Sequence, residues 1–153
     1  MNIRRSSLAS PEAGRLIAAL NAELTAMFPE PGATHFSLSG EQTEAGQGAF
    51  LVAWVEDVAA GCGAIRRVDE VTAEIKRMYV DPGFRGRGIG RALVEALERE
   101  ARQVGATKIV LETGTRLTRA IKLYQAMGYV QIPLFGEYLS SPKTSLCFGK
   151  SLA

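Results

Sequence analysis

A glycine-rich segment near the middle of the chain has the residue types and spacing to bind a pyrophosphate. It reads Arg85-Gly86-Arg87-Gly88-Ile89-Gly90-Arg91, follows an apolar strand and opens an amphipathic helix. Alternating glycines let the backbone come close to a ligand, and the N–H groups at the start of a helix converge on an anion. The arginines add charge-assisted hydrogen-bond donors. We therefore predict that all the residues of this segment bind a phosphate-bearing cofactor.

The segment does not match the two best-known phosphate-binding loops. A P-loop ends in Gly-Lys-Ser/Thr, whereas Gly90 is followed here by Arg91 and Ala92, so the magnesium-binding hydroxyl is missing. A Rossmann fingerprint needs a glycine at its sixth position, which is Arg91 or Leu93 here, depending on the glycine from which the count starts. The spacing therefore disfavours both a P-loop nucleotide site and a dinucleotide site.

Two motifs follow each other along the chain. The first is Arg-x-x-Gly-x-Gly at Arg85, Gly88 and Gly90, directly after the strand-like segment 73–80. The second is the segment 120–129, in which a helix bearing Leu-Tyr ends at a Gly-aromatic pair. Together they resemble the GNAT superfamily of acyl-CoA-dependent N-acyltransferases. The resemblance implies acetyl-CoA as cosubstrate, an amine as acceptor and no metal ion.

The resemblance also implies a cofactor site on the strand before the glycine turn. In this superfamily that strand splays from its neighbour, and the pantetheine arm inserts there like an extra strand. Its amides would pair with backbone groups of Met78 and Val80, with Tyr79 between them. The Met78 N–H would face the thioester oxygen and stabilise the negative charge that develops on it.

Tyr124 is the predicted general acid, and also a predicted cofactor contact, because it occupies the position of that acid in the superfamily. Attack of an amine on acetyl-CoA expels a thiolate, which a nearby phenol can protonate. Without the motif, a tyrosine beside Leu123 in an amphipathic helix would be interpreted as a packing residue.

The acceptor needs a base, since an alkylammonium with a pKa of about 10 is mostly charged at neutral pH. Glu74 is the first predicted base, because several superfamily members keep a catalytic glutamate there. Strand alternation would place Glu74 and Lys76 on the same face as Met78 and Val80, and a surface ion pair between Glu74 and Lys76 is the alternative. Glu112, at the end of an apolar strand, is the second predicted base and a candidate acceptor contact.

The segment 133–142 is a predicted part of the acceptor pocket. It lies between the last two predicted strands and combines Phe135, Glu137 and Tyr138 with glycine and serines. A surface loop held by its two aromatic side chains is the alternative. His35, in another predicted loop, is interpreted as a structural residue.

One position departs from the superfamily pattern. Many relatives carry Asn three residues before the alanine of the tyrosine helix, and this chain has Leu117 there. Leucine cannot make that hydrogen bond, so we expect Thr115 or Thr118 to cap the helix instead. The segments 111–116 and 133–138 are similar to a bacterial subgroup whose substrate the resemblance does not identify.

Length and composition predict a single cytoplasmic domain that spans residues 1–153. With 46% hydrophobic and 22% charged residues, the chain can bury one core. Apolar runs such as 49–55 are too short to span a bilayer, and the N-terminus lacks a signal-peptide pattern. The two cysteines, Cys62 and Cys147, suggest core thiols and no metal cluster. A net charge of +2 does not favour nucleic acid as a partner.

The predicted fold is mixed α/β, with a mostly antiparallel central sheet of six to seven strands, a splayed parallel pair and about four flanking helices. Ser10 and Pro11 predict the start of the first helix, and residues 34–48 are predicted as a loop or short helix. The predicted strands are 2–5, 49–55, 61–68, 72–80, 108–112, 129–133 and 145–150, and the predicted helices are 11–27, 90–103 and 118–127.

The predicted reaction is transfer of the acetyl group of acetyl-CoA to a primary amine by direct attack in a ternary complex. A two-step reaction through Cys62 is not needed, because a cysteine two strands from the glycine turn is more simply a core thiol. The alternative is a CoA-binding sensor or interaction protein, which the presence of Glu74 and Tyr124 disfavours. A nucleic-acid module built on residues 85–91 is a third interpretation. The sequence is compatible with a homodimer and leaves the acceptor open.

Overall fold

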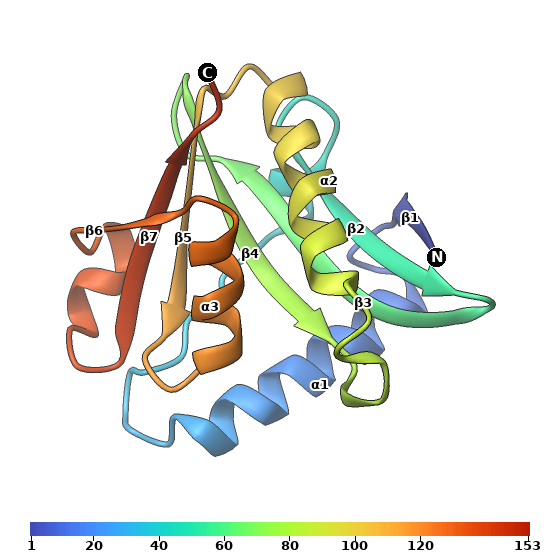
Figure 1. Cartoon of the computed structure of the whole chain (residues 1–153), viewed down its shortest axis with the longest axis horizontal. Coiled ribbons are helices and arrows are strands. Elements are labelled where there is room, and N and C mark those ends of the chain that lie inside the picture. Colours follow the sequence, from blue (N-terminus) through green and yellow to red (C-terminus); the bar gives the residue numbers. More distant parts are fainter.

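The computed structural model describes residues 1–153 and contains one seven-stranded mixed sheet in the order β1-β2-β3-β4-β5-β7-β6 (Figure 1). Only β4 and β5 pair in parallel, and every other neighbouring pair is antiparallel. The predicted sheet, mostly antiparallel with one parallel pair, is therefore confirmed. The strands are β1 (Asn2–Arg5), β2 (Gly48–Val55), β3 (Val58–Arg67), β4 (Thr72–Val80), β5 (Lys108–Gly114), β6 (Val130–Ile132) and β7 (Ser145–Ser151).

Three α-helices and three short 3-10 turns accompany the sheet. The first helix begins as its sequence predicts, because the Ser10 hydroxyl accepts a hydrogen bond from the Ala13 N–H and Pro11 occupies the first turn. The α-helices are α1 (Pro11–Met27), α2 (Ile89–Gln103) and α3 (Thr118–Ala126), and the 3-10 turns are Gly40–Thr43, Pro82–Phe84 and Gly136–Ser140.

Two hydrophobic clusters cover the two faces of the sheet. The larger cluster includes Leu93 and Leu97 of α2 and Tyr124 of α3. The smaller one includes Leu16 and Leu20 of α1. Figure 1 shows α2 and α3 in front of the sheet, whereas α1 crosses behind the lower end of β4. Each face is thus buried against helices, as an amphipathic helix and a two-sided sheet require.

A β-bulge interrupts β4 and overturns the predicted alternation of its side chains. Cys62 of β3 pairs with Tyr79, whereas Ala64 pairs with Lys76, so two steps along β3 correspond to three along β4. Arg77 lies in this interval and has a φ of +57°, in the left-handed region that non-glycine residues rarely adopt. One additional residue reverses the face on which every later side chain lies.

As a result, Glu74 and Lys76 do not share a face with Met78 and Val80. Met78 and Val80 pack against the α2–α3 cluster, together with Ile75. The side chains of Glu74 and Lys76 instead contact the segment that precedes β7, on the α1 side of the sheet. The bulge therefore lets one strand present different residues to two sides of the molecule.

Strand β4 separates from β5 halfway along its length. The two strands pair only from Thr72 and Lys108 to Ile75 and Leu111. Beyond that point β5 continues beside β7 alone, and residues 76–80 have no strand on their β5 side. Figure 1 shows that the two strands diverge: β4 runs toward α1, and β5 lies on the side of α3. The splayed pair that the resemblance implied is present.

Both cysteines are buried free thiols, as predicted. No group of three or more His, Cys, Asp or Glu side chains is placed to hold a metal ion. None of the helices combines the length and apolar character needed to cross a membrane.

We predict opposite effects of alanine at two glycines. A Cβ at Gly48 would lie 2.0 Å from the Ile65 carbonyl oxygen and 2.6 Å from that of Gln42, and both belong to backbone that cannot easily move. Gly48→Ala should therefore lower the free energy of unfolding by about 3 kcal/mol.

Gly14 in α1 provides the matched control, because a Cβ there would have no atom within 4 Å. Gly14→Ala should raise the free energy of unfolding by ~0.5–1 kcal/mol through helix propensity. Urea denaturation measures both variants, and equal effects would contradict the packing around Gly48.

Candidate active site

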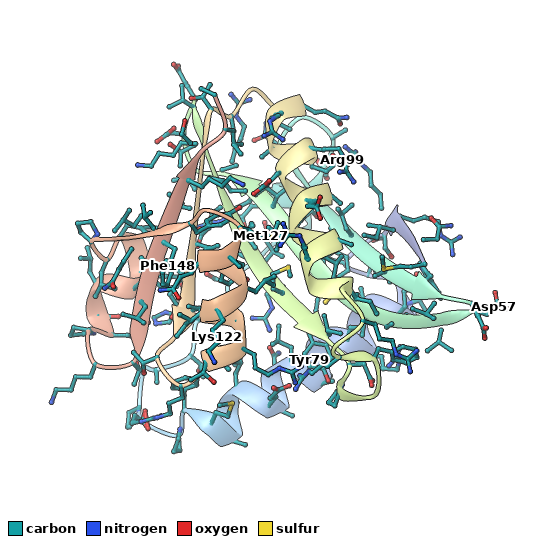
Figure 2. All side chains as sticks on the ribbon, in the orientation of Figure 1. Asp57, Tyr79, Arg99, Lys122, Met127 and Phe148 are labelled. Atoms are coloured by element: carbon teal, nitrogen blue, oxygen red, sulfur yellow. The ribbon has the colours of Figure 1, made fainter.

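A groove of about 540 Å³ opens where β4 parts from β5. One wall is the end of β4 with the glycine turn, and the others come from α1 and the start of α3. Figure 2 places Tyr79 at the end of β4, next to α1. The groove brings together nearly all residues of the predicted cofactor site, namely Met78, Tyr79, Val80, Arg85, Gly86, Gly88, Ile89, Gly90, Arg91 and Tyr124.

The glycine turn has the backbone geometry that an anion cradle needs. Gly86 and Gly88 have φ values of +82° and +79°, which side chains other than glycine rarely allow. Gly88 is the N-cap of α2 and supplies no side-chain acceptor for the first helical N–H groups. These N–H groups at the positive end of the helix dipole are therefore available to a ligand.

The arginines of the turn differ in what they contact. The Arg85 Nε donates to the Val80 carbonyl at 2.8 Å, and its guanidinium forms an ion pair with Glu23 at 2.8 Å, so it holds the turn against β4 and α1. Arg87 lies over the Phe84 ring and lines neither cavity. Arg91 lines the groove.

Arg91 keeps only a weak contact to protein acids. It is more than half exposed and forms a 3.7 Å ion pair with Glu95, one turn along α2. Among the three arginines, it is therefore the one most available to a phosphate.

The opposite wall of the groove contains cations that our sequence analysis missed. Arg116, Thr118 and Arg119, at the start of α3, line the groove. Arg116 is held by the Met27 carbonyl at 2.8 Å and by Glu30 at 2.7 Å. The signal available in the sequence was a pair of arginines that brackets the start of the tyrosine helix.

The predicted cap of α3 is absent. Leu117 is itself the N-cap residue, and no side chain caps the helix. Thr118 is already the first helical residue and Thr115 lies two positions before the cap, so neither hydroxyl is in the capping position. The first N–H groups of α3 consequently lack a side-chain partner beside the groove, in the same way as those of α2.

A second, smaller cavity of about 120 Å³ continues from the groove toward the loop before β7. Six residues line both cavities: Leu20, Leu24, Met78, Leu117, Ala120 and Tyr124. Met78 and Tyr124 thus stand where the two spaces meet. A reactant in the groove and a second reactant in the small cavity would contact each other at this point.

Tyr124 is buried but its hydroxyl makes no hydrogen bond within the protein. Its ring packs edge-on against Tyr129 at 5.7 Å, and the Tyr129 hydroxyl donates to Glu98 at 2.7 Å. Burial, and secondarily the charge of Glu112, raises the pKa of Tyr124. The phenol therefore stays protonated and is free to donate a proton at the junction.

Glu74 lies in a position that does not suit the predicted base. Its side chain is fully buried, forms an ion pair with Arg66 at 2.7 Å, and accepts a 2.5 Å hydrogen bond from the Tyr138 hydroxyl. It lines neither cavity. The alternative pairing with Lys76 is also wrong, because the Lys76 ammonium binds Glu137 at 3.2 Å. Glu74 is therefore a buried carboxylate held by Arg66 and Tyr138.

Glu112 is the carboxylate that lines the small cavity. It accepts a 2.6 Å hydrogen bond from the Ser145 hydroxyl. Burial raises the pKa of Glu112 to about 7, and the charges of Glu74 and Glu137 add to the rise, while Ser145 and Lys76 oppose it. A carboxylate with this pKa can exchange a proton at neutral pH.

The loop before β7 contributes to the small cavity less directly than predicted. Tyr138 lines the cavity, whereas Phe135 packs edge-on against the Tyr138 ring at 5.2 Å and does not reach it. Glu137 also lies outside the lining and binds Lys76 and the His35 Nδ1, each at 3.2 Å.

His35 lines the cavity, which sequence analysis did not anticipate. Its Nε2 lies 2.8 Å from the Ser141 hydroxyl, so both ring nitrogens are occupied by the loop before β7. This agrees with a structural histidine that holds the cavity wall in place.

Comparison with known proteins identifies the family. The model of the Acetyltransferase (GNAT) family matches residues 16–129. An "IAA acetyltransferase" of Azospirillum brasilense is 43% identical over 94 residues, which span 61% of this chain and 61% of that protein. The "uncharacterized N-acetyltransferase YsnE" of Bacillus subtilis is 30% identical over 123 residues, 79% of this chain and 80% of that protein.

A solved structure supports the same assignment. The crystal structure of a proposed acyl-CoA N-acyltransferase from Klebsiella pneumoniae has a TM-score of 0.82 and 32% identity, and the match covers 99% of this chain and 97% of that one. The resemblance stated from the two sequence motifs is thereby confirmed. The chain belongs to the Acetyltransferase (GNAT) family, the family of acyl-CoA-dependent N-acetyltransferases.

Proposed function

We propose that this protein transfers the acetyl group of acetyl-CoA to a primary amine by direct attack in a ternary complex. The observation that carries the proposal is the meeting of the two cavities at Met78 and Tyr124. A long groove with an anion cradle at one end suits the cofactor, and the small cavity suits the acceptor. Family membership supports the acyl donor.

The groove offers complementary groups for acetyl-CoA along its length. The glycine turn and Arg91 would bind the pyrophosphate, with Arg119 on the opposite wall. The edge of β4 beyond Ile75, which has lost its β5 neighbour, would pair with the pantetheine amides as a sheet edge pairs with a peptide.

The chemistry requires two proton movements. The amine nitrogen forms a bond to the thioester carbon, the carbon–sulfur bond breaks, and the thiolate leaves with the electron pair. The Tyr124 hydroxyl would donate a proton to this sulfur. Glu112 would accept a proton from the amine, directly or through water, since it lines the acceptor cavity and has a pKa of about 7. We assign this role to Glu112 in place of Glu74.

The cofactor assignment is tested by thermal unfolding with acetyl-CoA, CoA and NAD. A ligand at a hundred times its dissociation constant stabilises a protein by about 2.7 kcal/mol. We expect the unfolding midpoint to rise with acetyl-CoA and CoA and to stay constant with NAD. If neither acetyl-CoA nor CoA raises the unfolding midpoint, the assignment of the groove to the cofactor is contradicted.

Tyr124→Phe should lower kcat for thiol release by roughly 100-fold or more, the usual contribution of a general acid. Stabilisation by acetyl-CoA should remain, because the ring is kept.

Tyr129→Phe is the matched control. Its hydroxyl binds Glu98 and its side chain lines neither cavity, so this variant should lose about 1 kcal/mol of stability and keep its kcat. Equal losses of kcat in both variants would remove Tyr124 from the mechanism.

The pH dependence of Glu112→Gln tests the proposed base. Only the ionised carboxylate accepts a proton, and burial raises its pKa to about 7. The ratio of wild-type to variant kcat/KM should therefore rise between pH 6 and 8 and then level off. A ratio that does not change with pH would assign the base elsewhere.

Stability gives an independent control on the same ionisation. Between about pH 4.5 and 7 the unfolded Glu112 has lost its proton while the folded one retains it, so the unfolding equilibrium releases a proton. The free energy of unfolding of the wild type should thus fall over this range relative to Glu112→Gln. Chemical denaturation at several pH values measures the difference.

A further inference from the structure

Arg77 is a buried cation without an acidic partner. Only two cationic side chains are buried in the protein, Lys76 and Arg77. Lys76 has Glu137 at 3.2 Å, whereas no carboxylate lies within ion-pair distance of Arg77. A buried charge is expensive unless it is paired, so the missing partner needs an explanation.

The protein supplies only neutral contacts to this guanidinium. One terminal nitrogen of Arg77 donates to the Asn21 side-chain oxygen, and the Phe36 ring lies 5.0 Å from the guanidinium carbon. The Nε is buried with no hydrogen-bond partner. Cys62 is a neighbour, but burial raises the pKa of its thiol to about 12, so it remains uncharged at neutral pH.

The position of Arg77 links it to the small cavity. Arg77 is one of the residues that line this cavity, together with Glu112 and Tyr124. The β-bulge places it there, at the cost of a left-handed φ that strains a non-glycine residue. Thr113 also lines this cavity and carries the other buried polar atom without a hydrogen-bond partner. The two buried side-chain atoms without a hydrogen-bond partner, Arg77 Nε and Thr113 Oγ1, thus belong to residues that line one cavity.

We propose that the acceptor is a small amine that carries a carboxylate, as an amino acid does, and that this carboxylate pairs with Arg77. The inference rests on the proposed function, because it assigns the small cavity to the acceptor. An anionic group supplies the partner that the guanidinium lacks, with charge-assisted hydrogen bonds. The amino group then lies on the side of Glu112 and Tyr124, where it is deprotonated and attacks.

The size of the cavity limits the part of the acceptor that it can enclose. A volume of about 120 Å³ corresponds to roughly four water molecules at their liquid volume. An ammonium carboxylate fits this space, with any larger side chain extending along the apolar residues Leu20, Leu24 and Leu117 that also line the groove.

Matched amines test the proposal through acetyl-CoA-dependent thiol release. We would compare L-alanine, L-methionine and L-phenylalanine with their amides and with ethylamine, 3-(methylthio)propylamine and 2-phenylethylamine. The kcat/KM values are corrected for the fraction of free amine. At least one amino acid should exceed both its amide and its decarboxylated amine by tenfold or more.

Variants at Arg77 then connect the preference to this side chain. Arg77→Gln should remove the preference for the carboxylate by raising the KM of the amino acid, with little change for the amide. Arg77→Lys keeps the charge and should retain part of the preference. Arg119→Gln is the matched arginine control in the groove, and it should weaken acetyl-CoA binding without changing the preference.

The outcomes separate this inference from the proposed function. If the wild type acetylates the amides and simple amines as efficiently as the amino acids, the inference is overturned and the proposed function stands. This result does not depend on whether the variants fold. A preference that survives in Arg77→Gln would also overturn it. No thiol release with any of the nine amines would overturn the inference alone, whereas failure of acetyl-CoA to stabilise the protein would overturn both.

Discussion

The separation of β4 from β5 after Ile75 is the constraint on which the site depends. Backbone N–H and C=O groups away from water need hydrogen-bond partners, and the β5 side of residues 76–80 has no strand to provide them. An extended ligand with amide groups can meet this requirement. The opening also brings α3 and α1 to either side of the gap, so that Tyr124 reaches the end of the same strand.

The β-bulge at Arg77 gives this one strand two functions. Met78 and Val80 turn their side chains into the core beneath α2 and α3, which leaves their backbone at the groove. Lys76 and Arg77 carry their charges to the α1 side, where the smaller cavity lies. Regular alternation would have placed Lys76 on the core side with Met78. The strained backbone at Arg77 is therefore consistent with a position held for function.

The charges around the small cavity are arranged in pairs, with two exceptions. Glu74 has Arg66 and Tyr138, and Lys76 has Glu137. Glu112 has only the Ser145 hydroxyl, and Arg77 has only neutral contacts. The paired side chains hold the cavity walls in place, because separating a buried charge from its partner costs free energy. The two groups without a countercharge are the ones that can respond to a ligand.

Much of the site could be predicted because its motifs are local. The glycine turn, the start of α2 and the position of Tyr124 depend on residues within a few positions of one another, and backbone preference and helix periodicity act over that range. The position of Glu74, away from both cavities, could not be predicted for a complementary reason. Its partners Arg66 and Tyr138 come from a neighbouring strand and a distant loop, and no local pattern shows that they bury it.

The sequence by itself determined the family, the mixed sheet with its parallel pair, and the groove with its tyrosine, since each follows from short motifs and their order. Only the tertiary structure decided which charged residues line the small cavity. A single inserted residue at Arg77 reverses the face of every following side chain in β4, and the register of β3 and β4 alone reveals it. Contacts between segments far apart in the chain bury Glu74, place Glu112 at the cavity and leave Arg77 without an acidic partner.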